Sequence, residues 1–338
     1  MKTAVITGYG GLEKIEFIES KKPHPENNEL LIMVESFALN PKDILIRKGK
    51  FKRVSGNNFP KKIGFEFAGT VVDSAAKSQL KPGDRVFGLF NGWQGQCSTK
   101  YICIEDKHVW KIPEKTTFEQ ASGIALAGLT ALQALRDLGK ISPMSKVCIN
   151  GASGGVGSLA VQIAKQFKSN VTTISSQRNL KFCYSLGADD CIAYDKPNLL
   201  GLDNKYDIFF DVFGNYSYKK IKYMLSKNGR YITTVPSKDI FKQQVLNMFR
   251  NKKAKLVIVK SNKNDLNWLA KTISNNKIFP VIDKIYPFSE IKAAQSYLET
   301  KRARGKVIIT LSPSTDVTKS GREHFEYNLE NNFSGFGT

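Results

Sequence analysis

The sequence predicts an α/β protein made of two domains, and three observations support this. Residues 1 to about 118 contain many short apolar segments separated by glycine- and proline-containing turns, the pattern of an all-β unit. From about residue 119, expected strands and helices alternate, which is typical of a parallel sheet with helices on both faces. Within this second region a glycine-rich turn, residues 151–157, joins a short apolar strand to an amphipathic helix.

The first region is expected to form a barrel-like β domain over residues 1–122. Its apolar segments are short and are bounded by turn signals such as Pro82-Gly83-Asp84 and Asn91-Gly92. The expected strands are residues 3–7, 14–19, 29–39, 65–73, 84–90, 98–105 and 108–113.

The second region is assigned to a sheet-and-helix domain over residues 123–274. A long helical pattern over residues 118–139 leads into it. The expected strands that follow are residues 147–150, 171–175, 191–194, 206–212, 230–235 and 255–260, and the expected helices are residues 158–167, 179–186, 217–225, 240–249 and 265–276.

The remaining elements are too few for a third domain. They comprise an expected strand at 281–288, a helix at 289–299 and a strand at 306–311. We therefore expect residues 275–312 to return and complete the first domain. The polar segment 313–338 is expected to pack weakly or to be disordered.

The composition is that of an ordinary globular protein. Of 338 residues, 41% are hydrophobic and 24% charged, and we expect neither a membrane span nor a secretory signal. Five cysteines without a C-x-x-C pair favour reduced thiols in a cytoplasmic protein.

The net charge of +21 comes from lysines scattered along the chain. Two explanations of this charge are open: a coding bias toward lysine, and attraction to anionic partners such as a phosphorylated cofactor or a membrane surface. Without a basic run interleaved with aromatic residues, nucleic-acid binding is not favoured.

The glycine-rich turn allows two interpretations. Gly154 and Gly155 would let the backbone approach a ligand, Gly157 would let the helix pack closely on the strand, and the free N–H groups at the helix start would bind a pyrophosphate. The same residues match G-x-S-x-G, with Ser153 as the nucleophile of an α/β-hydrolase. That enzyme needs an acid and then a histidine later in the chain, and the one histidine after Ser153 is His324 in the polar tail. The dinucleotide interpretation is therefore favoured.

Seven motifs in order resemble the medium-chain dehydrogenase/reductase superfamily, and within it the zinc-free branch of quinone oxidoreductases and alkenal reductases. The resemblance implies a GroES-like β-barrel catalytic domain and an inserted Rossmann domain with a doubly wound parallel sheet, which agrees with the organisation above. The motifs are residues 38–49, 59–72, 80–88, 126–135, 149–165, 185–195 and 304–310.

The resemblance also implies that no metal is bound. Zinc-dependent relatives hold catalytic zinc with cysteine and histidine at positions that correspond here to Asn40, Phe65 and a residue near Ala127. These side chains offer neither thiolate nor imidazole, so a tetrahedral zinc site is not expected.

The cofactor is expected to be NADPH. The segment about 20 residues after the glycines, where an NAD-preferring domain has an acid, contains Ser175, Ser176 and Arg178 instead. Hydroxyls and a guanidinium suit a 2′-phosphate, although a simple helix cap at this place stays possible. The resemblance adds Tyr194 at the adenosine phosphate. Along the diphosphate we expect Ser153, Gly154, Gly155 and Val156.

For the reaction, the resemblance places Asn40 and Thr130 at the nicotinamide end, with Asn40 able to donate to a substrate oxygen. Asp43 and Arg47 are expected either to frame the substrate pocket or to form a solvated charge pair on one helix face. An aromatic set is expected to form a flat apolar pocket or to be plain core: Phe51, Phe65, Phe90 and Trp93.

The predicted function is therefore transfer of hydride from NADPH to a quinone or an α,β-unsaturated carbonyl. No histidine is placed to act as a general acid, and such electrophilic acceptors tolerate this. A non-catalytic NADPH-binding or sensor protein of the same fold is the main alternative. The expected edge strand 255–260 could pair with a second copy in a homodimer.

Overall fold

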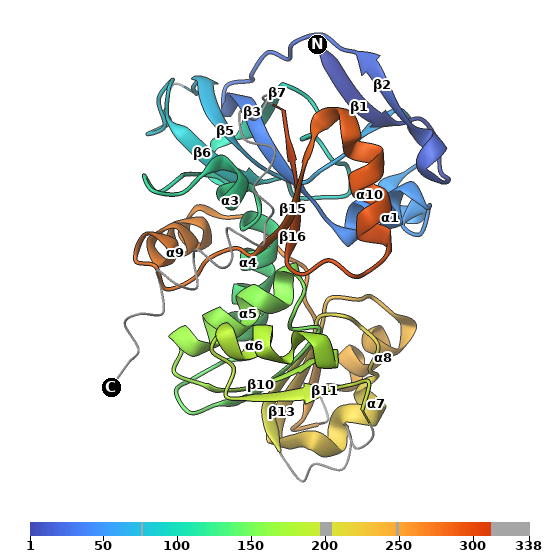
Figure 1. Cartoon of the computed structure of the whole chain (residues 1–338), viewed down its shortest axis with the longest axis vertical. Helices are drawn as coiled ribbons and strands as arrows, with labels where there is room; N and C mark the ends of the chain where they lie inside the picture. Colours follow the sequence, from blue (N-terminus) through green and yellow to red (C-terminus); the bar gives the residue numbers. More distant parts are fainter. Residues whose placement is uncertain (76, 197–204, 248–249, 312–338) are drawn as a thin grey trace. The chain divides into compact units, whose positions relative to one another are not determined.

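The computed structural model describes residues 1–75, 77–196, 205–247 and 250–311. The chain divides into two compact units (Figure 1). The first comprises Met1–Leu126 together with the chain from Lys260, and the second comprises Ala127–Val259. The α/β fold class is confirmed.

The first unit is mainly an antiparallel β structure, in which β15 and β16 form a parallel pair. A seven-stranded sheet has the order β15-β16-β3-β5-β6-β8, with β7 also paired to β3, and a three-stranded sheet has the order β2-β1-β4. Its strands are β1 (Lys2–Ile6), β2 (Ile15–Glu19), β3 (Glu29–Leu39), β4 (Lys61–Lys62), β5 (Glu66–Asp73), β6 (Arg85–Leu89), β7 (Tyr101–Glu105), β8 (Val109–Lys111), β15 (Ile282–Pro287) and β16 (Lys306–Thr310). Its helices are α1 (Pro41–Arg47), α2 (Lys52–Ser55), α3 (Phe118–Ser122), α9 (Lys263–Ser274) and α10 (Ile291–Glu299).

The seven strands expected in the first region are confirmed, and the pairing explains why the chain end belongs with them. β16 lies antiparallel to β3, with Val307 opposite Leu39. Val307 and Ile309 are fully buried in the same core as Phe37 and Phe67. β16 is buried over its whole length, because Ile308 packs with Ala38 in a second cluster. The strand thus pairs with the part of β3 that β7 leaves free.

One boundary of the predicted domains is wrong. Residues 260–274 were assigned to the second domain, whereas α9 packs on β8 in the first unit. Leu266 and Leu269 supply the buried face of this helix. The amphipathic pattern reveals that such a face exists but not which sheet it covers. The other boundary falls at Leu126 rather than residue 122, inside α4 (Ala125–Leu132). Residues 313–338 lie outside the described part of the chain.

The second unit is a six-stranded parallel sheet with the order β11-β10-β9-β12-β13-β14. Numbered within the unit, this is the order 3-2-1-4-5-6 found in dinucleotide-binding sheets, so the direction of winding reverses between β9 and β12. The strands are β9 (Lys146–Asn150), β10 (Asn170–Ser175), β11 (Asp190–Ala193), β12 (Tyr206–Asp211), β13 (Leu225–Thr233) and β14 (Lys253–Leu256). The helices are α5 (Gly155–Gln166), α6 (Leu180–Ser185), α7 (Tyr218–Ile221) and α8 (Lys238–Leu246).

Helices cover this sheet in the sequence order that was predicted. α5 and α6 lie over β10 and β11, and α7 and α8 lie toward the opposite edge, beside β13 and β14 (Figure 1). The long helical pattern of residues 118–139 is divided by Gly123 into α3 and α4, and it ends in a π-type turn, Gln133–Leu138. The edge strand β14 ends at Leu256, four residues earlier than predicted.

Candidate functional site

The glycine-rich turn lies at the carboxyl end of β9, where the sheet reverses its winding. Gly151 has φ +80°, a conformation that side chains rarely adopt. A Cβ on Gly157 would lie 2.1 Å from the Gly151 carbonyl oxygen, so only glycine lets α5 start this close to the strand. The predicted packing role of Gly157 is thereby confirmed.

The start of α5 has the features of an anion site. Its N-cap, Gly154, provides no side-chain cap, so the first N–H groups of this 12-residue helix are left for a ligand. A Cβ on Gly154 would meet only the Gly151 carbonyl, at 3.6 Å, so the outer surface of the turn is open. Backbone N–H groups at an uncapped helix start suit a diphosphate, and the residues present fit a dinucleotide.

The segment expected to bind a 2′-phosphate lies beside this turn. The Asn179 side chain donates to the Ser153 hydroxyl over 2.9 Å. On the other side, the Tyr194 backbone N–H donates to the Ser175 carbonyl over 2.9 Å. Ser153, Ser176, Arg178 and Tyr194 are thus brought together at the carboxyl ends of β9, β10 and β11, and Arg178 and Tyr194 are exposed.

Ser175 differs from its neighbours. Its side chain is buried, and its hydroxyl donates to the Ser176 carbonyl and lies 3.5 Å from the Cys183 sulfur. As the last residue of β10, it points into the unit, so a contact between its hydroxyl and a 2′-phosphate is not supported by the structure. The carboxylate of Asp195 accepts from the Gln177 backbone N–H of this segment over 2.8 Å.

A buried carboxylate at the reversal of winding was missed by the sequence analysis. Asp211, at the end of β12, is fully buried and accepts four hydrogen bonds. Its donors are Asn150 Nδ2 at 2.7 Å, the backbone N–H of Gly214 at 2.8 Å and of Tyr216 at 3.0 Å, and the Tyr231 hydroxyl at 3.1 Å. Burial and this carboxylate raise the pKa of Tyr231, which keeps its hydroxyl a donor.

Asp211 therefore fixes the loop that follows β12 against β9 and β13. Beside it is a cavity of about 270 Å³, lined in part by Gly214, Tyr216, Tyr231 and Thr233. The sequence does contain one signal for Asp211: it ends an apolar strand, and ligands bind at the carboxyl ends of the strands in such sheets.

In the first unit, Asn40 belongs to a buried polar network. Lys306 Nζ donates over 2.6 Å both to Asn40 Oδ1 and to Glu66 Oε1. Asn40 Nδ2 donates to Glu66 Oε1 over 3.0 Å and to the Ala38 carbonyl over 3.3 Å. All three side chains of the network are at least 96% buried.

This network changes the interpretation of Asn40. Both amide hydrogens point at protein acceptors, so donation from Asn40 to a substrate oxygen has no structural support. The partners lie 26 and 266 residues further along the chain and could not be anticipated from the local sequence. Thr130, the other residue expected at the nicotinamide end, lies buried on α4 in the second unit.

Asp43 and Arg47 do not form the solvated charge pair considered above. Asp43 is buried, and its carboxylate accepts from the backbone N–H groups of Gly64 and Asn40, both at 2.8 Å. Burial raises the pKa of Asp43 to about 6, against the opposing effect of these hydrogen bonds. Arg47 is fully buried and binds Gln295 and Glu299 of α10. It joins α1 to α10 and does not line the pocket that Asp43 lines.

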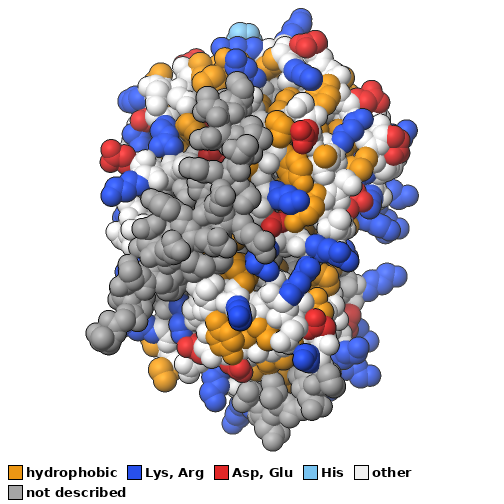
Figure 2. Space-filling view, in the orientation of Figure 1, with side chains coloured by type: hydrophobic (Ala, Val, Ile, Leu, Met, Phe, Trp, Pro, Cys, Tyr) orange, Lys and Arg blue, Asp and Glu red, His pale blue; other side chains and the backbone are white. Residues whose placement is uncertain are grey.

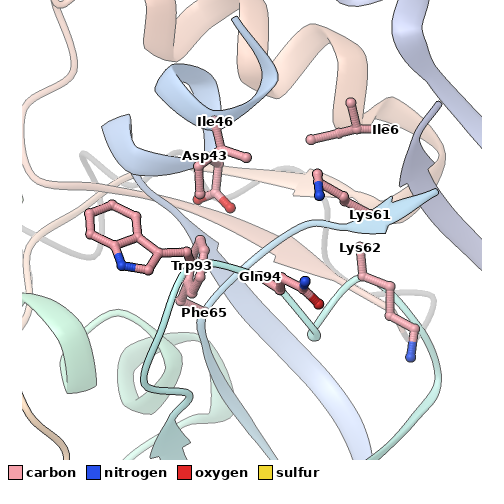
Figure 3. A pocket seen from close by; sticks show the side chains of 9 residues that line it. Ile6, Asp43, Ile46, Lys61, Lys62, Phe65, Trp93 and Gln94 are labelled. Atoms are coloured by element: carbon pink, nitrogen blue, oxygen red, sulfur yellow. The ribbon is translucent and has the colours of Figure 1, made fainter. Parts of the chain in front are cut away.

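The aromatic set separates into pocket and core. Phe65 and Trp93 line a small pocket together with Asp43 and, on its other side, Lys61 and Lys62 (Figure 3). The Phe51 ring lies 4.9 Å from that of Trp93. Phe90 instead packs on Phe67 in the main core. Three of the four aromatic residues are thus grouped, and Phe90 is core.

The residues present do not fit zinc. Asn40, Phe65 and Ala127 supply no thiolate or imidazole. Within the described ranges, no group of three or more histidine, cysteine, aspartate or glutamate side chains could hold a metal ion.

No histidine accompanies Ser153 among the described residues of its own unit. The described histidines, His24 and His108, both belong to the first unit, whereas Ser153 belongs to the second. His324 lies outside the described residues. The Ser153 hydroxyl instead accepts from Asn179.

Together these features define a two-unit nucleotide-binding protein of the dehydrogenase class. Known proteins agree with this. Residues 26–122 match the alcohol dehydrogenase GroES-like domain, and residues 186–309 match a family described as zinc-binding dehydrogenase. The metal named in the second description is a property of that family.

Individual relatives are similar over nearly the whole chain. An NADPH-dependent alkenal/one oxidoreductase of Arabidopsis thaliana is 35% identical over 91% of this chain and 79% of its own. A quinone-oxidoreductase homolog of Spinacia oleracea is 29% identical over 90% and 96%. The solved quinone oxidoreductase from Coxiella burnetii is 30% identical, with a TM-score of 0.83 over 92% and 99%. The chain belongs to the medium-chain dehydrogenase/reductase superfamily, in the branch of quinone oxidoreductases and alkenal reductases.

Proposed function

We propose that the protein is a zinc-independent oxidoreductase that transfers hydride from NADPH to a quinone or an α,β-unsaturated carbonyl. The observation that carries the proposal is the uncapped start of α5 beside a segment that presents Ser176, Arg178 and Tyr194. The relative from Arabidopsis thaliana, named as NADPH-dependent and acting on alkenals and alkenones, supports the cofactor and the acceptor class.

In this proposal each part of the second unit has a role. The N–H groups at the start of α5 hold the diphosphate, and Arg178 with Ser176 holds the 2′-phosphate. Asp211 fixes the loop after β12 at the carboxyl edge of the sheet. When bound, NADPH supplies the hydride, and the protein supplies orientation and exclusion of water.

Two further expectations are part of the proposal. All five cysteines are free thiols, which supports a cytoplasmic location. The outer edge of β14 could pair with a second copy, which supports a homodimer. In the part of the chain that the structure describes, no helix is long and apolar enough to cross a membrane. Lysine and arginine side chains are spread over the visible face rather than gathered in one band (Figure 2).

The acceptor panel tests the proposal. Purified protein is mixed with NADPH and, in turn, with 9,10-phenanthrenequinone and a short alkenal, and the loss of NADPH absorbance is followed. Turnover with either acceptor is expected. Tight NADPH binding without turnover across the panel would instead favour the non-catalytic alternative. Covalent labelling of Ser153 by a fluorophosphonate would favour the hydrolase.

Replacing Arg178 by aspartate is expected to weaken the use of NADPH much more than the use of NADH. The change places a carboxylate where the 2′-phosphate is proposed to lie, so the KM for NADPH should rise by about 10- to 100-fold while that for NADH changes by less than about threefold. Steady-state kinetics with both cofactors measure this. Lys219→Asp, on the exposed side of α7, is the control for a general loss of positive charge. An equal effect of Arg178→Asp on both cofactors would contradict the assignment.

A further inference from the structure

A lysine in the first unit lies over the aromatic pocket and has no role in the function described so far. Lys42 is the second residue of α1 and is half-buried. Its Nζ lies 3.9 Å from the ring centre of Phe65 and 4.9 Å from that of Trp93. It also donates a hydrogen bond to the Gly92 carbonyl.

These contacts hold the ammonium in place without neutralising it. Aromatic faces and a carbonyl attract a cation but carry no net charge. The one acid beside Lys42 on α1 is Asp43, whose carboxylate is already bound by two backbone N–H groups. Lysine has three donor hydrogens, and one goes to Gly92. The positive charge of Lys42 therefore remains available to an anionic group.

One of the two rings beside Lys42 lies at the surface of the first unit. Trp93 is 37% exposed, so the aromatic surface formed with Phe51 reaches the exterior of the first unit. A flat, electron-poor acceptor can lie on such a surface, and its carbonyl oxygen can then reach the ammonium. Phe65 is buried, and its ring packs against Lys42 on the interior side.

We propose that Lys42 is a catalytic residue that binds the carbonyl oxygen of the acceptor and supplies the proton that completes its reduction. The inference rests on the proposed function. Hydride adds to the β-carbon of the enone and leaves an enolate. The enolate oxygen takes a proton from Lys42 Nζ, the N–H electron pair stays on nitrogen, and solvent returns a proton to the amine. The enol formed in this way becomes the saturated carbonyl compound when solvent adds a proton to its α-carbon and takes up the proton on its oxygen. A quinone takes up hydride and the same proton to give the hydroquinone.

The titration of Lys42 suits this role. Burial lowers its pKa to about 8, although the Asp43 carboxylate acts to raise it. Lys61 and Lys62 of β4 also line the pocket, and the charge of Lys306 acts on the Asp43 carboxylate. The ammonium form predominates below pH 8, so a rate that needs this donor falls as the pH rises through about 8.

Three variants test the proposal. Lys42→Met keeps the apolar stem over the rings but removes the donor. We expect kcat to fall by about 100-fold or more, the KM for NADPH to change by less than about twofold, and the decline near pH 8 to disappear. Lys42→Arg keeps the charge and should restore part of kcat and move the decline above pH 8. Lys50→Met, on an exposed neighbouring turn, is the control and should behave as the wild type.

A binding measurement separates this inference from the proposed function. We expect 4-nitrophenol to bind the wild type with its equilibrium shifted toward the phenolate, seen by its visible absorbance, and to lose this shift in Lys42→Met. If the wild type shows the shift but reduces no acceptor, the anion site stands and the proposed function fails. If kcat and its pH profile are unchanged in Lys42→Met, or if the phenolate shift is absent or the same in both proteins, the role of Lys42 is overturned.

Discussion

Replacing Gly157 by alanine is expected to destabilise the second unit by about 3 kcal/mol or more and to abolish NADPH binding. The added Cβ would lie 2.1 Å from the Gly151 oxygen and 2.7 Å from the Ala152 Cα. Both are backbone atoms, so no change of rotamer relieves the overlap, and α5 must move away from β9. The start of α5 then no longer holds a diphosphate. Thermal unfolding and fluorescence titration with NADPH measure the two effects.

Gly154→Ala is the matched control for this prediction. Its Cβ would make an ordinary contact at 3.6 Å, and the backbone at φ −83° accepts alanine. We expect a nearly unchanged melting temperature and an NADPH affinity about tenfold lower, because the new methyl lies on the open surface of the turn. Normal stability and normal NADPH binding in Gly157→Ala would show that α5 does not depend on this close approach.

The second large effect is expected for Lys306→Met. Lys306 and Glu66 form an ion pair whose side chains are 4% and 0% exposed. Removing the ammonium leaves a buried carboxylate without its counter-ion, which costs about 3–5 kcal/mol. The loss should appear in urea unfolding of the first unit. The double variant Lys306→Met with Glu66→Gln should recover part of it, because no unpaired charge remains.

An exposed ion pair provides the comparison for Lys306. Lys165 and Asp189 are 2.8 Å apart with side chains 31% and 47% exposed. Lys165→Met should therefore change the free energy of unfolding by less than about 1 kcal/mol. If Lys306→Met costs no more than Lys165→Met, the buried network around Asn40 does not stabilise the fold in the way described.

The parts of the fold that could be predicted are those set by local sequence. Alternating apolar residues revealed the strands of the first unit, and the 3.6-residue period with the glycine-rich turn revealed β9 and α5. The need for glycine at position 157 is also local, because the atoms that a side chain there would meet belong to Gly151 and Ala152. Ser153, Arg178 and Tyr194 are close together because consecutive parallel strands bring their carboxyl ends to one edge.

The parts that could not be predicted depend on partners far along the chain. Arg47 is buried because Gln295 and Glu299 of α10 receive it, and nothing near residue 47 indicates this. Asn40 is engaged by Lys306 for the same reason. Ser175 lies in the segment that usually binds the 2′-phosphate, but side chains alternate along a strand, and that of Ser175 faces the interior. Lys42 escaped notice because a lysine in a helix is usually solvated, and only the three-dimensional arrangement places Phe65 and Trp93 beneath it.

The central claim is that this chain delivers hydride from NADPH to an electrophilic acceptor, and isotope transfer tests it most directly. NADPH carrying deuterium at the transferable position of the nicotinamide is incubated with the protein and a short alkenal, and the product is analysed by mass spectrometry and NMR. The account predicts a saturated aldehyde with one deuterium on the β-carbon and none on the α-carbon. A product without deuterium, or NADPH that is bound but never oxidised by the alkenal or by a quinone, would contradict it.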